Sequence, residues 1–274
     1  MAPLLLSGCG ETLVDDPVIE KAVRETLGKP NGSLTKEDLE EITALDVSGS
    51  SGKYRFQQIS KHFKNLTHLD VSYTNASLYD LSPLPSLVSL NVSGNNLYTT
   101  DLVEIERFQN LKELDLSFNR IEEWYNINRI KTLKRLSISG YDMVVNLDEL
   151  NSLVNLEFLK LVNHHEPDSP DENRMPWSWE YSLQGLERFR QLKSLEIGGF
   201  PAKKFELLEG LPNLEKLTIH WNYNINPSMF GELDGLRNLK LCNCNLRELD
   251  GFQSIAGLEE LDLRHNPFDS LEAL

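Results

Sequence analysis

Apolar and polar residues follow one recurring frame along the chain, and residues 111–121 show it most clearly. This stretch reads Leu-Lys-Glu-Leu-Asp-Leu-Ser-Phe-Asn-Arg-Ile. Residues 114–117 suit a short strand, after which the chain turns away at Asn119. Because side chains alternate between the two faces of a strand, Glu113, Asp115 and Ser117 then face water. The inward side chains are Leu111, Leu114, Leu116, Asn119 and Ile121.

The same frame occurs ten times along the chain, at intervals of 21 to 24 residues with one longer interval of 36. One unit cannot bury its own apolar row, so neighbouring units must stack into a curved solenoid. The pattern therefore predicts an α/β solenoid, a leucine-rich repeat horseshoe with a parallel β-sheet on its concave face. The first apolar residue of each repeat, which we call the anchor, is Ile42, Leu66, Leu87, Leu111, Leu133, Leu156, Leu192, Leu214, Leu236 or Leu258.

The residue eight positions after the anchor is polar in most repeats. It is Asn95, Asn119, Asn222 or Asn266 in four repeats and Thr74 or Cys244 in two others. A buried polar side chain there can pair with backbone groups of the turn and of the next repeat. Tyr141, His164 and Phe200 break this rule, so repeats five to seven should have the least regular turns.

We divide the chain into three parts. Residues 42–274 contain the repeats, and residues 11–41 suit an N-terminal helical cap that covers the first of them. In the cap, Asp16 precedes Pro17 as a helix N-cap, and Thr35 to Asp38 form a capping box. Residues 1–10 resemble the end of a bacterial lipoprotein signal, because Leu6-Ser7-Gly8-Cys9 matches the sequence that precedes a lipidated cysteine.

The signal interpretation predicts lipidation of Cys9, but its apolar part is short and no Lys or Arg precedes it. A truncated signal sequence would reconcile these facts, and the alternative is an unmodified tail. The net charge of −15 argues against binding to nucleic acid or to anionic membranes. The sequence has no run of about 18 apolar residues, so we expect membrane attachment only through lipid at Cys9.

The long interval contains an insertion at residues 163–182. Three prolines exclude a regular helix there, so it should form a loop, and long loops on rigid scaffolds often carry function. Its aromatic residues, Trp177 and Trp179, either pack back onto the solenoid or form a recognition lip over the concave face.

The concave face is read from positions two, four and six after each anchor. The first four repeats place small, polar and acidic residues there, and we interpret Asp46, Asp70 and Asp115 as a solvated stripe. Repeats six to nine combine apolar anchors with charges, a composition typical of a binding hot spot. Tyr73, Phe118 and Trp221 share one position, but the sequence spacing puts them too far apart for a single aromatic box. The predicted ligand-binding residues of the face are Phe158, Lys160, Glu196, Lys216, His220, Trp221 and Lys240.

The sequence predicts no catalytic residue, cofactor or metal site. Phosphate-binding, hydrolase and zinc-protease motifs are absent, and leucines fill the inward positions. His164 to Asp168 match no standard metal-ligand spacing. Cys242 should face water and Cys244 should face inward, so we expect no disulfide between them.

Residues 16–274 resemble the internalin-type leucine-rich repeat proteins of Gram-positive bacteria. The resemblance rests on residues 18–30, on residues 34–48 and on repeats such as Leu-Lys-Arg-Leu-Ser-Ile at 133–138. It implies a secreted or surface-attached, non-enzymatic protein that recognises another protein or a glycan on its concave face, which we expect to be monomeric. The alternatives are an intracellular scaffold similar to phosphatase-associated repeat proteins and one recognition domain of a larger adhesin.

Overall fold

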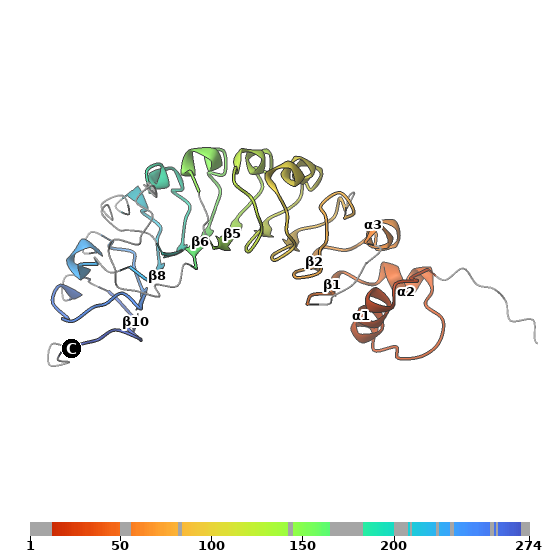
Figure 1. Cartoon of the computed structure of the whole chain (residues 1–274), viewed down its shortest axis with the longest axis horizontal. Helices are drawn as coiled ribbons and strands as arrows, with labels where there is room; N and C mark the ends of the chain where they lie inside the picture. The colour runs from red at the N-terminus through yellow and green to blue at the C-terminus, as the bar shows by residue number, and fades with distance from the viewer. Residues whose placement is uncertain are drawn as a thin grey trace, which may run out of the picture.

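Ten short parallel strands follow one another across a single sheet in chain order, and Figure 1 shows them on the inner side of an arc. The computed structural model describes residues 13–49, 56–81, 84–141, 145–164, 183–199, 208, 210–222, 225–230, 233–252, 255 and 257–269. The strands are β1 (Ala44–Asp46), β2 (His68–Asp70), β3 (Ser89–Asn91), β4 (Glu113–Asp115), β5 (Arg135–Gly140), β6 (Phe158–Asn163), β7 (Ser194–Gly198), β8 (Lys216–His220), β9 (Asn238–Cys242) and β10 (Glu260–Asp262). The predicted horseshoe is confirmed.

Short helical turns form the outer side of the arc (Figure 1). They are α3 (Gln57–His62) and the 3-10 helices η1 (Thr99–Arg107), η2 (Tyr125–Arg129), η3 (Leu147–Leu150), η4 (Leu186–Arg188) and η6 (Pro227–Phe230). A strand on one side and a compact turn on the other make the outer edge of each repeat wider than its inner edge, which curves the stack.

The core is one continuous apolar column between the sheet and the outer turns. The strands pair in register, so that Leu114 of β4 stands beside Leu90 of β3 and Leu136 of β5. The anchor Leu111 is fully buried, and Leu116 is only 1% exposed. The inward positions are therefore filled by side chains, as the repeat pattern predicts.

Asparagine side chains join consecutive turns next to this core. The Asn119 Oδ1 accepts hydrogen bonds from the backbone of Asn95 at 3.0 Å and of Leu97 at 2.9 Å. Its Nδ2 donates to the carbonyl oxygens of Val92 and Leu116, both at 3.0 Å. One side chain thus satisfies four backbone groups in two neighbouring repeats, which confirms the role predicted for position eight.

Two helices precede β1. In α1 (Pro17–Leu27), the Asp16 side chain accepts from the backbone of Val18 and Ile19, and the helix ends at Gly28 in a left-handed conformation. In α2 (Lys36–Glu40), Thr35 and Asp38 form the capping box read from the sequence. Helix α1 packs against β1 at the first end of the sheet. No helix in the described part of the chain is long and apolar enough to cross a bilayer.

The strand of the fourth repeat ends earlier than predicted. It covers Glu113–Asp115 rather than residues 114–117. The Asp115 Oδ1 accepts a hydrogen bond from the Ser117 backbone N–H at 2.9 Å, and this short-range bond bends the chain out of the strand. Asp46 and Asp70 bind the backbone of Ser48 and Ser72 in the same way.

Candidate binding surface

Three large aromatic residues occupy a left-handed backbone conformation where the chain leaves its strand. Tyr73, Phe118 and Trp221 lie seven residues after their anchors and have φ of 57°, 56° and 50°. Bulky side chains rarely adopt this conformation, which costs an L-residue about 1–2 kcal/mol. Three other repeats place Gly49, Gly94 and Gly199 at the same position with φ of 66° to 69°. The turn itself therefore does not require an aromatic side chain.

Repeats five and six leave the sheet differently. Strands β5 and β6 continue as a paired ladder as far as Gly140 and Asn163, and neither residue has a positive φ. The next residues, Tyr141 and His164, occupy position eight without the buried asparagine arrangement, and Tyr141 is 68% exposed. The irregular turns predicted for these two repeats thus bring two more rings to the same edge of the sheet.

These five side chains form one continuous series of ring contacts, which we call the aromatic row. Tyr73 and Phe118 have ring centroids 6.5 Å apart, and Phe118 stacks on His164 at 5.1 Å. Tyr141 lies 6.1 Å from Phe118 and 6.2 Å from His164. His164 meets the Trp221 ring edge-on at 5.3 Å. Tyr73, Phe118 and Trp221 thus form an extended row rather than the single aromatic box that their spacing argued against. His164, which the sequence did not place at this edge, connects Phe118 to Trp221.

Glycine allows the first of these contacts. A Cβ atom on Gly94 would lie 2.5 Å from the Tyr73 ring, so only glycine in the third repeat lets that ring extend toward Phe118. Tyr73 nevertheless remains 56% exposed. Phe118, His164 and Trp221 are partly buried. Packing thus holds the rings of the aromatic row in place, and each ring remains at least partly accessible to solvent.

A polar cluster on β6, β7 and β8 adjoins the Trp221 end of the row. The Lys160 Nζ lies 3.0 Å from the Glu196 Oε1, and the His220 Nε2 lies 3.3 Å from the same oxygen. Burial of Glu196 acts to raise its pKa, but hydrogen bonds from His220 and Lys160 outweigh burial, and the pKa lies below its usual value. The His220 ring contacts Trp221 at 5.4 Å. The structure thus brings four of the predicted binding residues together.

His164 remains neutral more readily than an ordinary histidine. Burial within the aromatic row lowers its pKa, and the positive charge of Lys160 lowers it further. The neutral ring stacks on Phe118 as an aromatic group. Protonation would place a charge in a partly buried ring series close to Lys160 and His220.

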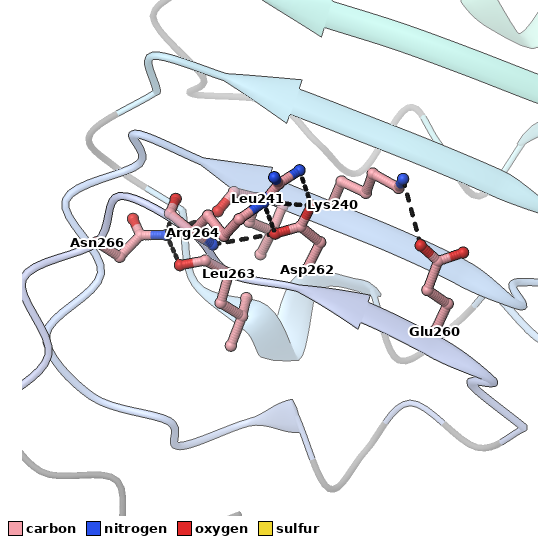
Figure 2. A network of polar contacts seen from close by, with 7 residues as sticks. All are labelled: Lys240, Leu241, Glu260, Asp262, Leu263, Arg264 and Asn266. Carbon is pink, nitrogen blue, oxygen red and sulfur yellow. Dashed lines mark hydrogen bonds and ion pairs between the residues drawn. The ribbon is translucent and has the colours of Figure 1, made fainter.

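The remaining predicted residues are spread over the concave face. Phe158 on β6 lies under the Arg135 guanidinium, whose central carbon is 4.1 Å from the ring centroid. Lys216 on β8 is exposed. The Lys240 Nζ lies 3.2 Å from the Glu260 Oε1 on the neighbouring strand β10, and Figure 2 shows this ion pair between the two strands. Lys240 is therefore less available as a binding cation than the sequence suggested.

Position six of the repeats is largely buried, contrary to the sequence-based interpretation of the concave face. Ser72, Ser93, Ser117 and Ser139 are between 4% and 7% exposed. Cys242 was expected to face water but is 8% exposed, and burial raises the pKa of its thiol. Residues at this position lie at the end of the strand or just after it, where the chain bends into the turn, so residues of neighbouring repeats cover them.

The acidic residues at position four are more than a solvated stripe. Asp46 is exposed, but Asp70 and Asp115 are half-buried and each accepts a backbone hydrogen bond that forms its turn. Asp262 binds the Arg264 backbone and side chain in a related arrangement on β10, visible in Figure 2. Burial raises the pKa of Asp115, although hydrogen bonds from Ser117 oppose this effect.

Three predicted sites lie outside the described residues. They are Trp177 and Trp179 in the insertion and Cys9 at the N-terminus. Tyr141, His164 and Arg135 also lie at the binding surface, although the sequence pattern did not predict them there. The loss of asparagine at position eight in repeats five and six indicated irregular turns there, but it did not show where Tyr141 and His164 would point.

Comparison with known proteins supports the same architecture. Residues 109–122 match the family model described as "Leucine Rich repeat". The chain is 25% identical over 288 aligned residues to an adenylate cyclase of Schizosaccharomyces pombe, covering 90% of this chain and 16% of that protein. It is 28% identical to Tsukushi of Gallus gallus over 74% of this chain and 63% of that protein. The chain thus spans only part of each curated relative.

One solved structure shares the fold of this chain over nearly all of that structure's length. Internalin C2 of Listeria monocytogenes superposes with a TM-score of 0.61 at 23% identity, covering 84% of this chain and 94% of that chain. The ten-stranded parallel sheet, the repeated leucine core and this likeness agree with one another. The chain is a leucine-rich repeat solenoid with an internalin-like fold.

Proposed function

We propose that this chain is a non-enzymatic recognition module that binds another protein along the aromatic row and the adjoining concave strands β4–β8. The observation that carries the proposal is that Tyr73, Phe118 and Trp221 have a left-handed backbone conformation. Three other repeats have glycine at the same position, seven residues after the anchor, and glycine adopts this conformation at a lower free-energy cost. Backbone strain of this kind clusters at functional sites, where the surrounding structure holds it in place. Tyrosine and tryptophan are also enriched among the few residues that carry most of the binding energy of protein interfaces.

The polar cluster gives the proposed surface its specificity. Glu196 is held between Lys160 and His220 and is half-buried, so its charge has a defined position. A partner that approaches Trp221 must present groups compatible with this cluster, since an unmatched charge on burial is costly. A glycan is the alternative ligand, because sugar rings also stack on aromatic side chains.

Site-specific photo-cross-linking tests this proposal. A photoreactive phenylalanine analogue replaces Tyr141 in one variant and Tyr125 in the control; the two tyrosines are 68% and 52% exposed, and Tyr125 lies on the outer side of the solenoid in η2. After exposure to native host extract and to the host surface, we expect a protease-sensitive adduct only from position 141. An adduct that only glycosidases remove would favour a glycan, and equal adducts from both positions would contradict the proposal.

We further propose that the module acts at the bacterial cell surface, attached through lipid at Cys9. The match of residues 6–9 to a lipoprotein signal supports this location. Intact-mass measurement of the protein from the membrane fraction of its native host should find a chain that begins at a diacylated Cys9. An unprocessed chain would favour the intracellular scaffold instead.

A further inference from the structure

The charged residues of the concave face differ in whether they have ion-pair partners. On strands β6 to β10, Lys160 pairs with Glu196 at 3.0 Å and Lys240 pairs with Glu260 at 3.2 Å. On β2 and β4, Asp70 and Asp115 have no Lys, Arg or His within ion-pair distance among the described residues. Among the residues that the structure describes, the Asp70 carboxylate accepts one side-chain hydrogen bond, from the Asn91 amide at 2.8 Å, in addition to its backbone bond. The unbalanced negative charge thus lies at the β2–β4 end.

An aromatic ring accompanies each of these carboxylates. Tyr73 follows Asp70 by three residues at the exit of β2, and Phe118 follows Asp115 by three residues at the exit of β4. The two rings contact each other over Gly94. A guanidinium group suits this pairing because it can bind a carboxylate with its N–H groups and stack its plane on an aromatic ring.

From this geometry we propose that the β2–β4 end of the concave face, bounded by Tyr73 and Phe118, binds an arginine-containing segment of the partner protein. The inference rests on the proposed function and specifies the chemistry of the partner. A metal ion is a poor alternative, because two strand intervals separate Asp70 from Asp115 by about 10 Å. Oxygen ligands of one cation each lie only about 2.5 Å from it.

The spacing of the two carboxylates also predicts the form of the segment. It crosses the strands along the aromatic row, and its arginines must match a separation of about 10 Å. In a polyproline II helix, residues three apart point in the same direction and lie about 9 Å apart. Prolines of such a segment would pack on Tyr73 and Phe118, as proline-rich ligands pack in other aromatic-lined grooves. We therefore expect arginine at every third residue.

Fluorescence anisotropy with labelled synthetic peptides tests this inference. The probe is a proline-rich peptide with arginine at every third residue. Two matched peptides replace arginine with neutral citrulline or place the same number of arginines at every second residue. We expect the first peptide to bind roughly tenfold or more tightly than either control, because each charge-assisted hydrogen bond contributes strongly. Equal affinity for the citrulline peptide would overturn the proposal.

Protein variants locate the peptide on the surface. The double variant Asp70→Asn and Asp115→Asn removes both charges but keeps the oxygen that accepts the turn hydrogen bond, as Asn91 does in the third repeat. The control is Glu122→Gln with Glu123→Gln, two exposed acids beyond the exit of β4. We expect the aspartate variant to lose roughly tenfold or more in affinity and the control to bind as the wild type does.

Different results would overturn the arginine site and the proposed function as a recognition module. Loss of affinity in both double variants to the same extent would mean that net charge alone attracts the peptide, which overturns the arginine site. The absence of peptide binding would also overturn it, while a protein adduct at position 141 would still support the proposed function.

Discussion

The backbone strain at Tyr73 makes a quantitative prediction that two pairs of variants can isolate. The first pair is Tyr73→Gly and Tyr73→Ala, and the second is Tyr125→Gly and Tyr125→Ala. Both tyrosines are about half exposed, at 56% and 52%, but only Tyr73 has a positive φ, of 57°. Comparing glycine with alanine at one position removes the contribution of the lost ring, because both variants lack it. The comparison therefore reports on the backbone.

The magnitudes follow from the two conformations. At Tyr125, in the first turn of η2, glycine should lower the free energy of unfolding relative to alanine by about 0.5–1 kcal/mol, because glycine loses more conformational freedom on folding. At Tyr73 the left-handed conformation costs alanine about 1–2 kcal/mol, which exceeds the entropy cost of glycine. Glycine should then be the more stable residue by about 0.5–1 kcal/mol. The sign of the glycine-to-alanine effect reverses between the two positions.

Urea unfolding of the four variants, with free energies extrapolated to water, measures both differences. The difference between the two pairs equals the left-handed penalty itself, about 1–2 kcal/mol, because the entropy cost of glycine cancels. If alanine is more stable than glycine at position 73 as well, the backbone there is not strained. Backbone strain would then no longer support a binding role for Tyr73.

Three further changes test the fold and its charges. Asn119→Ala removes the side-chain partner of the Asn95 and Leu97 N–H groups and of the Leu116 carbonyl, so it should cost about 3 kcal/mol or more in urea unfolding. The exposed control Asn155→Ala, which loses one hydrogen bond of 3.2 Å, should cost under about 1 kcal/mol. Leu239→Ala should cost about 2–5 kcal/mol by the same assay, because its side chain is fully buried. Because the pKa of His164 is lowered in the folded state, the unfolded chain binds the His164 proton at a higher pH than the folded chain does. The free energy of unfolding should therefore fall as the pH decreases below about 6.5. His164→Phe should show a smaller loss of melting temperature between about pH 7.5 and 5.5, and an unchanged loss would contradict the assignment.

Much of the fold was predictable because the repeat pattern is locally determined. The anchors set the strand register, and Asp16 and Thr35 cap the first two helices as their positions suggest. Position eight was also predictable, since a partly buried asparagine such as Asn119 has backbone groups of two turns within reach. These features depend on residues close in sequence or on strictly repeated spacing.

The aromatic row was not predictable, because it depends on how far each strand continues before its turn. Tyr141 and His164 would point inward if their repeats followed the asparagine pattern. Pairing of β5 with β6 through Gly140 carries both rings to the edge of the sheet instead. Burial at position six was missed for a related reason. A side chain such as Cys242 faces the concave side by strand alternation, but the bend after the strand places it under neighbouring residues.

The most direct test of the binding surface is the affinity of the photo-cross-linked partner, measured by titration calorimetry with the wild type, Tyr141→Ala and Tyr125→Ala. Each variant removes one exposed tyrosine, and only Tyr141 belongs to the aromatic row. A hot-spot aromatic contributes about 2 kcal/mol or more, so Tyr141→Ala should raise the dissociation constant by roughly 30-fold. Tyr125→Ala should leave it unchanged. Equal dissociation constants for all three proteins would contradict the assignment of the aromatic row as the binding surface.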